Sequence, residues 1–338
     1  MALHARGGRD LYVLGAGFSK SLSPTTPTMK NLTTELLEAD LSSHTYLARY
    51  VEDYRTAIDK GSDHYTIESI CSALFGTELY RDVSHEHFVA GARIEFLRWL
   101  AHNIHYGRTG PADQTLAGFR IDPDRADIAS RFLEGSSVES PEPGRDVSAR
   151  IVTLNYDLLV ESVLQLDDAR SWRCDYHVRL SRYGETAGTE DTRVLPYLKL
   201  HGSLNWFRVA GAERNDVAAV VEVPPGTVME SLHRHDPPVF VPMAHARRAF
   251  LTGTLFPTLW RVMCYSLAQA EAIHFVGYGF PRTDLNLLLE FARHKNKVKT
   301  VVIKETEGAF GTKQRRFRRL FPNARVVNCD AMEFLAAE

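Results

Sequence analysis

Residues Tyr197–Phe207 read Tyr-Leu-Lys-Leu-His-Gly-Ser-Leu-Asn-Trp-Phe, and this segment is the first indication of the fold. An apolar run typical of a buried strand ends at His201, and Gly202 then turns the chain. Ligands of open α/β sheets bind in the crevice outside the carboxyl ends of the strands. His201 is therefore a candidate functional residue, although the backbone of a core or a turn could equally satisfy a single histidine here.

Five further segments predict strands, of which the first three are of the same buried kind and the last two are short. Leu11–Leu14, for example, lacks the alternation of apolar and polar residues, as expected of a strand covered on both faces. The chain is thus predicted to be an α/β protein with a Rossmann-like parallel sheet of about six strands flanked by helices. The other five strands are expected at Asp10–Leu14, Arg150–Leu154, Ala272–Val276, Thr300–Lys304 and Arg325–Asn328.

The length of 338 residues allows one large domain or two ordinary ones. We expect a single domain over residues 1–338, in which two insertions interrupt the Rossmann core. The core comprises residues 10–30, 149–207 and 270–338, the helical insertion residues 31–148, and the second, smaller insertion residues 208–269.

Shorter elements follow from local composition. Segments rich in Ser, Thr, Pro and Gly predict loops at Ser21–Met29 and Gly135–Asp146, and the polar, glycine-bearing segment Ser181–Arg193 predicts a loop or an irregular hairpin. In the second insertion we expect strands at Val217–Val223 and Pro237–Pro242. Helices are expected at Lys30–Glu38, Leu158–Leu166, Thr258–Gln269, Leu285–His294 and Lys313–Leu320.

The composition is that of an ordinary globular protein, with 44% hydrophobic and 24% charged residues. The net charge of −2 creates no global attraction to nucleic acid or to an anionic membrane, so direct binding of either is not expected. No apolar run approaches the roughly 20 residues of a spanning helix, and the first residues lack a signal core. We therefore expect a cytoplasmic protein.

Cysteine and histidine usage predicts no metal site. Cys71, Cys174, Cys264 and Cys329 are too widely spaced for a redox pair or a zinc ribbon, and reduced thiols are expected. The pairs His85/His87, His102/His105 and His233/His235 have no cysteine or carboxylate companions at ligand spacing. The basic cluster at Lys313–Arg319 is interpreted as a solvated helix face, with contact to a partner protein or nucleic acid as the alternative.

Four predicted strands end in small or polar residues. These ends are Gly15–Ser19, Asn155–Asp157, His201–Ser203 and Gly277–Gly279. Because the carboxyl ends of parallel strands share one edge of the sheet, all four motifs are predicted to meet at a ligand site. Core packing alone does not readily explain four such ends.

Each motif has a chemical and a structural interpretation. Gly15–Ser19 could let backbone amides approach a pyrophosphate or could form a tight turn, and Lys20 breaks the full dinucleotide fingerprint. Asn155 can orient a hydroxyl group or a water molecule. Asp157 could accept from a ribose hydroxyl or cap the following helix. His201 is the best candidate for a general base, because imidazole titrates near neutral pH.

The four motifs resemble those of sirtuin-like proteins, in which they come in the same order. They are Gly-Ala-Gly-Phe-Ser at 15–19, Thr-Leu-Asn-Tyr-Asp at 153–157, Lys-Leu-His-Gly-Ser-Leu-Asn-Trp at 199–206, and Gly-Tyr-Gly-Phe-Pro-x-x-Asp at 277–284. The chain looks most like the divergent bacterial sirtuin-like NAD hydrolases that act as effectors of antiphage defence. The resemblance spans residues 10–338.

The resemblance implies a role for each matching residue. Asn155 and His201 match the catalytic asparagine and histidine of the family, and Asp157 matches its NAD-pocket aspartate. The remaining NAD contacts are implied for Gly15, Ala16, Gly17, Phe18 and Ser19 at the diphosphate, Pro27 and Thr28 near the nicotinamide ribose, Gly277 and Tyr278 at the adenosine ribose, and Lys304 and Asp330 near the adenine.

One departure from the family bears on the reaction. Deacylating sirtuins carry a four-cysteine zinc ribbon after the His-Gly motif, whereas residues 208–268 here contain a single cysteine, Cys264. The resemblance therefore favours water as the acceptor and an NAD glycohydrolase that depletes NAD in antiphage (abortive-infection) defence. We expect restraint by a homo-oligomer, by a separately encoded sensor or regulatory subunit, or by both. The alternatives are a non-catalytic NAD or ADP-ribose binding scaffold and an NAD-dependent deacylase or ADP-ribosyltransferase.

Overall fold

The computed structural model describes residues 9–60, 62–76, 83–106, 121–139, 148–166, 172–182, 193–212, 214–224, 227–228, 230–231, 236–242, 253–281 and 284–337. Most of the predicted loops at Gly135–Asp146 and Ser181–Arg193 lies outside these residues, as do His233 and His235 and the side chain of His85. Within the described part of the chain, no helix is both long enough and apolar enough to cross a membrane.

A parallel sheet forms the centre of the molecule. Six strands pair side by side, all parallel, and confirm the predicted Rossmann-like sheet. In spatial order they are β11 (Arg325–Asn328), β10 (Val298–Ile303), β9 (Ala272–Val276), β1 (Asp10–Leu14), β3 (Ile151–Thr153) and β6 (Arg193–Lys199).

Two strands that the sequence patterns do not predict extend this sheet. Both pair with the first half of β6: β2 (Val138–Glu139) runs antiparallel to it and β4 (Trp172–Asp175) runs parallel. Both are short and lack the apolar run that marks the inner strands β1, β3 and β9. β1 lies between β9 and β3, and Leu11–Leu14 is fully buried.

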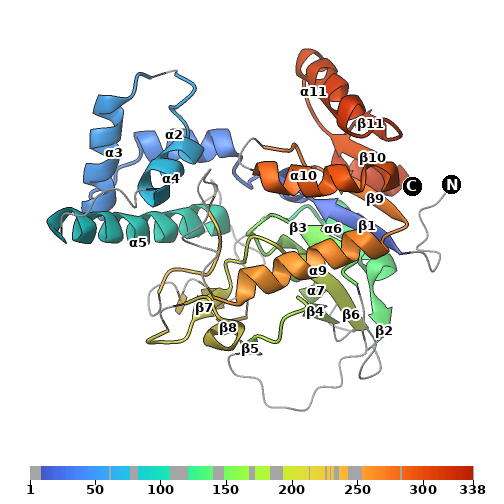
Figure 1. Ribbon diagram of the computed structural model, residues 1–338, viewed down its shortest axis with the longest axis horizontal. Coiled ribbons are helices and arrows are strands. Elements are labelled where there is room, and N and C mark those ends of the chain that lie inside the picture. Colours follow the sequence, from blue (N-terminus) through green and yellow to red (C-terminus); the bar gives the residue numbers. More distant parts are fainter. Residues whose placement is uncertain are drawn as a thin grey trace.

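Helices cover both faces of the sheet (Figure 1). On one side, helices pack with one another through the contacts α1–α12, α1–α6, α6–α12 and α6–α7. They are α1 (Ala16–Leu22), α6 (Pro123–Ser136), α7 (Leu159–Gln165) and α12 (Ala331–Ala337). In front of the sheet in Figure 1 lie α9 (Leu255–Gln269) and α10 (Leu285–Arg293), whereas α11 (Glu307–Leu320) connects β10 with β11.

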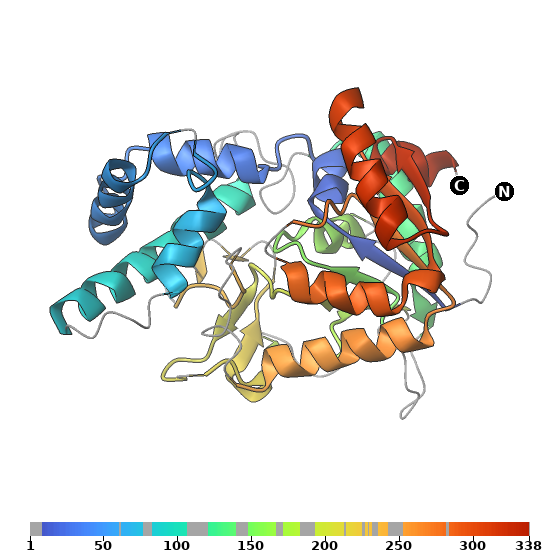
Figure 2. The ribbon, with the colours of Figure 1, turned by 45° about the horizontal axis from the view of Figure 1, so that its top comes forward.

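The segment predicted as a helical insertion is mainly helical where it is described. Four helices stand together beside the sheet in both views (Figures 1 and 2). They are α2 (Met29–Glu38), α3 (Thr45–Ala57), α4 (Ile67–Gly76) and α5 (Val83–Tyr106). Leu47, Val51 and Tyr54 of α3 form its buried stripe, as their helical spacing predicts.

A small second sheet joins β5 (Ser181–Arg182), β8 (Val220–Glu222) and β7 (Trp206–Arg208), and of these three strands only β8 lies wholly within residues 208–269, the predicted second insertion. The strand predicted at Val217–Val223 is shorter than expected, because a 3-10 turn (Val217–Ala219) precedes it. The strand predicted at Pro237–Pro242 is wrong: only Phe240 forms a bridge, with Gly202. Pro237, Pro238 and Pro242 have no N–H to donate to a ladder, which is the physical reason.

The predicted turn at Gly15–Ser19 needs a correction. A helix, α1, begins at Ala16 immediately after β1, so no loop separates the glycine motif from a helix. Gly17, Ser19 and Ser21 are poor helix formers, and local propensity therefore argues against this helix. Tertiary packing overrides the propensity, because Phe18 and Leu22 are buried on the side that faces the core.

Candidate functional site

A chain of hydrogen bonds joins the ends of β1 and β3. The amide nitrogen Nδ2 of Asn155 donates to Oγ of Ser19 at 2.8 Å, and Ser19 Oγ donates to Oδ2 of Asp157 at 2.7 Å. Ser19 and Asp157 are buried, whereas Asn155 is half-buried. Oδ1 of Asp157 accepts from the backbone N–H of Leu159, the first residue of α7, at 3.2 Å. Asp157 therefore supports the helix start and holds Ser19 at the same time.

The direction of this chain fixes the orientation of the Asn155 amide. A carboxylate only accepts hydrogen bonds, so the Ser19 hydroxyl group donates its single proton to Asp157. Ser19 Oγ can then only accept from Asn155, which turns the NH₂ group toward Ser19. The carbonyl oxygen of Asn155 consequently faces away from Ser19. Asn155 is arranged to accept a hydrogen bond from a hydroxyl group or a water molecule.

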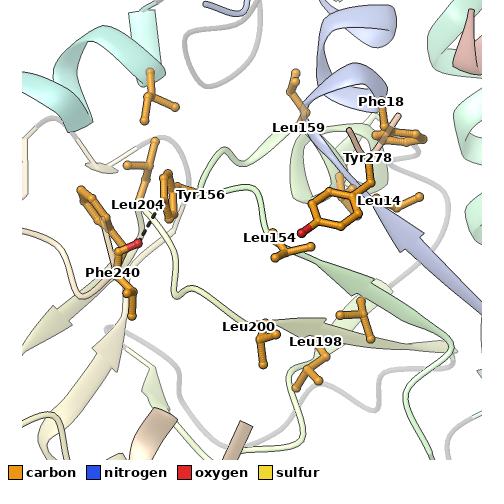
Figure 3. Close-up of a cluster of buried hydrophobic side chains, with 14 of the residues drawn as sticks. Leu14, Phe18, Leu154, Tyr156, Leu159, Leu198, Leu200, Leu204, Phe240 and Tyr278 are labelled. Atoms are coloured by element: carbon orange, nitrogen blue, oxygen red, sulfur yellow. Dashed lines mark hydrogen bonds between the residues drawn. The ribbon is translucent and has the colours of Figure 1, made fainter. Parts of the chain in front are cut away.

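His201 follows β6, the strand next to β3, so it and Asn155 come from adjacent carboxyl ends. Its side chain is 8% exposed, and its ring centroid lies 6.3 Å from that of Tyr156. Its carbonyl oxygen accepts from Val241 N at 2.8 Å. Tyr156 in turn packs against Phe240 and donates from its hydroxyl group to the Val241 carbonyl at 2.6 Å (Figure 3). The segment Pro237–Pro242 thus packs against the backbone of His201 and against Tyr156.

The glycine motifs after β1 and β9 pack directly against each other. Gly17 N donates to the Gly277 carbonyl at 2.8 Å, and Gly15 N donates to the Val276 carbonyl at 3.0 Å. A Cβ atom on Gly277, whose φ is 70°, would lie 2.2 Å from Phe18 N. Close approach of the start of α1 to the segment after β9 is therefore one reason for these glycines. Their predicted contact with a diphosphate stays a prediction.

The neighbouring predicted contact residues are placed as follows. The ring of Phe18 is buried in the core, so only its backbone could reach a ligand. The ring of Tyr278 is buried and packs against that of Phe280, with the centroids 4.5 Å apart, and its hydroxyl group donates to Asp284 at 2.7 Å. Asp284 stands at the N-cap of α10 but makes no side-chain cap there.

Pro27 and Thr28 lie in the connection from α1 to α2. Pro27 is buried, and Thr28 is exposed and caps α2 through a reciprocal pair of hydrogen bonds with Asn31. The connection is tied back to α1, because Lys20 Nζ donates to the Thr26 carbonyl at 3.0 Å. Their role at the nicotinamide ribose stays a prediction.

Asp330, after β11, is held by several groups of the protein itself. It accepts hydrogen bonds from Ser21 Oγ and from Met332 N, and Arg125 and Lys304 lie 3.4 Å and 3.6 Å away. Burial by itself raises the pKa of the Asp330 carboxyl, but these hydrogen bonds and positive charges outweigh it, so the pKa is lowered. Asp330 therefore ties α1 and α6 to the C-terminal helix. A contact of Asp330 or Lys304 with adenine stays a prediction.

The sequence interpretation missed a buried polar network beneath this edge. Its centre is Lys199, which is 0% exposed and forms an ion pair with Glu161 at 2.9 Å. A signal for it was present, because a lysine inside an apolar strand needs a buried partner. No group of three or more metal-ligand side chains was found among the described residues.

An α/β fold with polar groups from several strand ends at one edge defines a class of ligand-binding Rossmann-like proteins. A family model described as the SIR2-like domain matches residues 149–325, more than half of the chain. The chain belongs to this family, whose activity is NAD-related. The matched region includes Asn155, His201 and Gly277.

Two solved structures illustrate the similarity. One, on "the Mechanism and Regulation of Sir2 Enzymes", has a TM-score of 0.40 and 13% identity over 99% of this chain and 95% of that chain. The other, "Sir2Tm bound to a propionylated peptide", has a TM-score of 0.36 and 13% identity over 97% of this chain and 90% of that chain. No curated protein sequence matches the chain.

Proposed function

We propose that this protein is an NAD glycohydrolase, which cleaves NAD to nicotinamide and ADP-ribose. The observation that carries the proposal is the hydrogen-bonded set Ser19–Asn155–Asp157, which leaves the Asn155 carbonyl oxygen as an acceptor. His201 lies on the adjacent strand end. An oriented acceptor beside an imidazole suits the activation of a hydroxyl group or a water molecule.

The reaction breaks the bond between C1′ of the ribose and the nicotinamide nitrogen, and a water oxygen bonds to C1′. Nicotinamide leaves with the electron pair of the broken bond, and the water loses one proton. In this proposal Asn155 accepts a hydrogen bond from the attacking water, and His201 removes a proton from the water or from a ribose hydroxyl. General acid–base assistance of this kind contributes typically about 10²–10⁴-fold to the rate.

Several features support NAD as the substrate and water as the acceptor. The family is NAD-related, and the motifs after β1 and β9, which the resemblance assigns to the diphosphate and the adenosine ribose, lie against each other. Residues 208–268 have one cysteine, Cys264, so the four-cysteine ribbon of deacylating sirtuins has no counterpart there. No metal has a part in the proposed reaction.

We further propose that the protein acts in antiphage defence in the cytoplasm, and that its assembly with itself or with other subunits controls the hydrolysis of NAD. Uncontrolled hydrolysis of NAD would poison the host cell, so the activity needs restraint. A homo-oligomer, a separately encoded sensor or regulatory subunit, or both would supply it. Size-exclusion chromatography with light scattering, on the chain alone and with proteins encoded beside it, measures the assembly directly.

Nicotinamide release from NAD tests the proposal. The protein, alone and with candidate partner subunits, is incubated with NAD, and nicotinamide is followed by chromatography. We expect His201→Ala to lower the release by at least about 10²-fold, as for loss of a general base. The matched control is His294→Ala. His294 lies between α10 and β10, near the amino ends of the parallel strands, whereas the candidate site lies at their carboxyl ends. Release at the wild-type rate in His201→Ala would contradict the assignment.

The same experiment separates the alternatives. A binding scaffold would bind NAD or ADP-ribose, measured by calorimetry, without releasing nicotinamide even when the partner is present. A deacylase or ADP-ribosyltransferase would consume NAD only after an acylated or acceptor protein is added. Nicotinamide release in equal amount with ADP-ribose, and without any acceptor, is the result expected for a hydrolase.

A further inference from the structure

Lys199 lies beneath the candidate site as the centre of a buried cluster of titratable side chains that the proposed reaction does not use. Its ammonium group donates to Oε1 of Glu161 at 2.9 Å and to the backbone carbonyl of Asp157 at 2.5 Å. Lys199 is 0% exposed and Glu161 is 6% exposed. A buried ion pair contributes little net stability compared with apolar residues of similar size, so its presence here suggests a role in placing the groups it contacts.

The cluster continues from Glu161 to the small sheet. The Tyr176 hydroxyl group lies 3.3 Å from Oε1 of Glu161 and 3.1 Å from Oε1 of Glu222. Burial, with the charges of Glu222 and Glu161, raises the pKa of Tyr176 well above its usual value, so the phenol keeps its proton. The proton of the Tyr176 hydroxyl group is thus shared between the carboxylates of Glu161 and Glu222.

The same network holds the segment after His201. Asn205 Nδ2 donates to Oε1 of Glu222 at 3.4 Å and to the Val223 carbonyl at 3.1 Å, and Ser203 Oγ donates to Asn205 Oδ1 at 2.6 Å. Ser203 and Asn205 are both 0% exposed. His201 is therefore flanked by two buried anchors, Lys199 before it and Ser203 with Asn205 after it.

We propose that Lys199 is a positioning residue, which fixes the strand end of Asn155 relative to that of His201. It does so by binding the carbonyl group of Asp157, whose side chain orients Ser19 and, through Ser19, the Asn155 amide. Lys199 is also two residues from His201 on the same strand end. The inference rests on the proposed function for its catalytic readout. The placement of residues 154–160, which follow β3, can be measured even if the protein does not hydrolyse NAD.

If Lys199 served only as the partner of Glu161 in a structural ion pair, the loss of Glu161 would have the same effect on activity and exchange as the loss of Lys199. If Lys199 acts through the Asp157 carbonyl, only the loss of Lys199 has that effect. Three variants separate the two. Glu161→Gln removes the charge pair and keeps the bond from Lys199 to the Asp157 carbonyl, although it leaves the buried Lys199 without its counter-charge and is expected to be less stable than the wild type. Lys199→Met leaves Glu161 buried without its cation and is expected to be unstable. The double variant, Lys199→Met with Glu161→Gln, has no unpaired charge and lacks the tie to Asp157.

The experiment measures kcat and KM for nicotinamide release, together with hydrogen–deuterium exchange of the amides in residues 154–160. We expect the double variant to lose about 10- to 100-fold in kcat with KM changed less than about 3-fold, since a displacement near 1 Å can cost 10²-fold. Exchange in 154–160 should increase. Under conditions in which it stays folded, Glu161→Gln should keep kcat within about 3-fold and leave this exchange unchanged, because the bond from Lys199 to the Asp157 carbonyl is still present.

Several outcomes would overturn the proposal. They are wild-type kcat in the double variant, a fall in kcat without faster exchange in 154–160, or a loss of more than about 10-fold in Glu161→Gln. If the double variant does not fold, kcat and exchange in 154–160 are compared between Glu161→Gln and the wild type: values close to the wild type support the proposal, and a loss of more than about 10-fold in kcat overturns it. If the wild-type protein releases no nicotinamide, the proposed function fails. Exchange in 154–160 then decides the positioning role separately: faster exchange in the double variant supports it and unchanged exchange overturns it.

Discussion

Ser19 offers a sharp test of the candidate site, because a single hydroxyl group joins two of its members. Ser19→Ala removes the acceptor of the Asn155 amide and the donor to the Asp157 carboxylate. A hydrogen bond to a charged group contributes about 1.5–3 kcal/mol and a neutral one about 1 kcal/mol. Both are lost at a serine that is 1% exposed, so we expect the free energy of unfolding to fall by about 2–4 kcal/mol.

Ser162 provides a matched control within α7. It is 0% exposed, and its hydroxyl oxygen has no hydrogen-bond partner among the described residues. Ser162→Ala makes the same chemical change without breaking a hydrogen bond, and it should stay within about 0.5 kcal/mol of the wild type or stabilise the protein. The difference between the two variants therefore isolates the hydrogen bonds from the change in side-chain volume.

Urea unfolding followed by tryptophan fluorescence measures both variants, and nicotinamide release gives a second readout. Ser19→Ala should also lower kcat by about 10- to 100-fold, because the Asn155 amide is no longer held in one orientation. Equal unfolding free energies for Ser19→Ala and Ser162→Ala, within about 0.5 kcal/mol, would refute the hydrogen-bond network as described.

Two further predictions concern residues around the same edge. Gly277→Ala should reduce the free energy of unfolding by more than about 2 kcal/mol, because φ is 70° and the added Cβ would lie 2.2 Å from Phe18 N. Gly211→Ala, with φ 84° but open space around it, should cost only about 1 kcal/mol in the same urea experiment; equal costs would contradict the packing argument. Asp330 has a lowered pKa in the folded protein, so its contribution to stability is present above the unfolded value of about 3.9 and is lost as pH falls through the folded pKa. Asp330→Asn should therefore be less stable at pH 7 and show a shallower loss of stability below about pH 4, and an unchanged slope in acid unfolding curves would oppose this assignment.

The local pattern was sufficient for the sheet. The inner strands β1, β3 and β9 consist mostly of apolar residues, and strands covered on both faces need little else to be recognised, whereas β11 is a short strand at the edge of the sheet whose residues are exposed or half-buried. The polar residues after four of the predicted strands predicted a common edge, and the structure links those of β1 with β3 and those of β1 with β9. Their order along the chain was also enough to indicate the family that the model of residues 149–325 shows.

Other features depend on contacts between segments far apart in the sequence. α1 forms against the propensities of Gly17, Ser19 and Ser21, because burial of Phe18 and Leu22 outweighs them. Prolines prevented a strand at Pro237–Pro242, yet that segment still packs behind His201 through backbone hydrogen bonds.

The sequence by itself determined the parallel sheet, the edge at which the motifs meet and the family, because apolar runs and residue order are local properties. The tertiary structure decided which atoms meet at that edge. It bonds Ser19 to both Asn155 and Asp157, and it brings Lys199 beneath Asp157, 42 residues away in the chain. Hydrogen bonds have direction and short range, so the orientation of the Asn155 amide and the partner of a buried lysine exist only after the strands have come together.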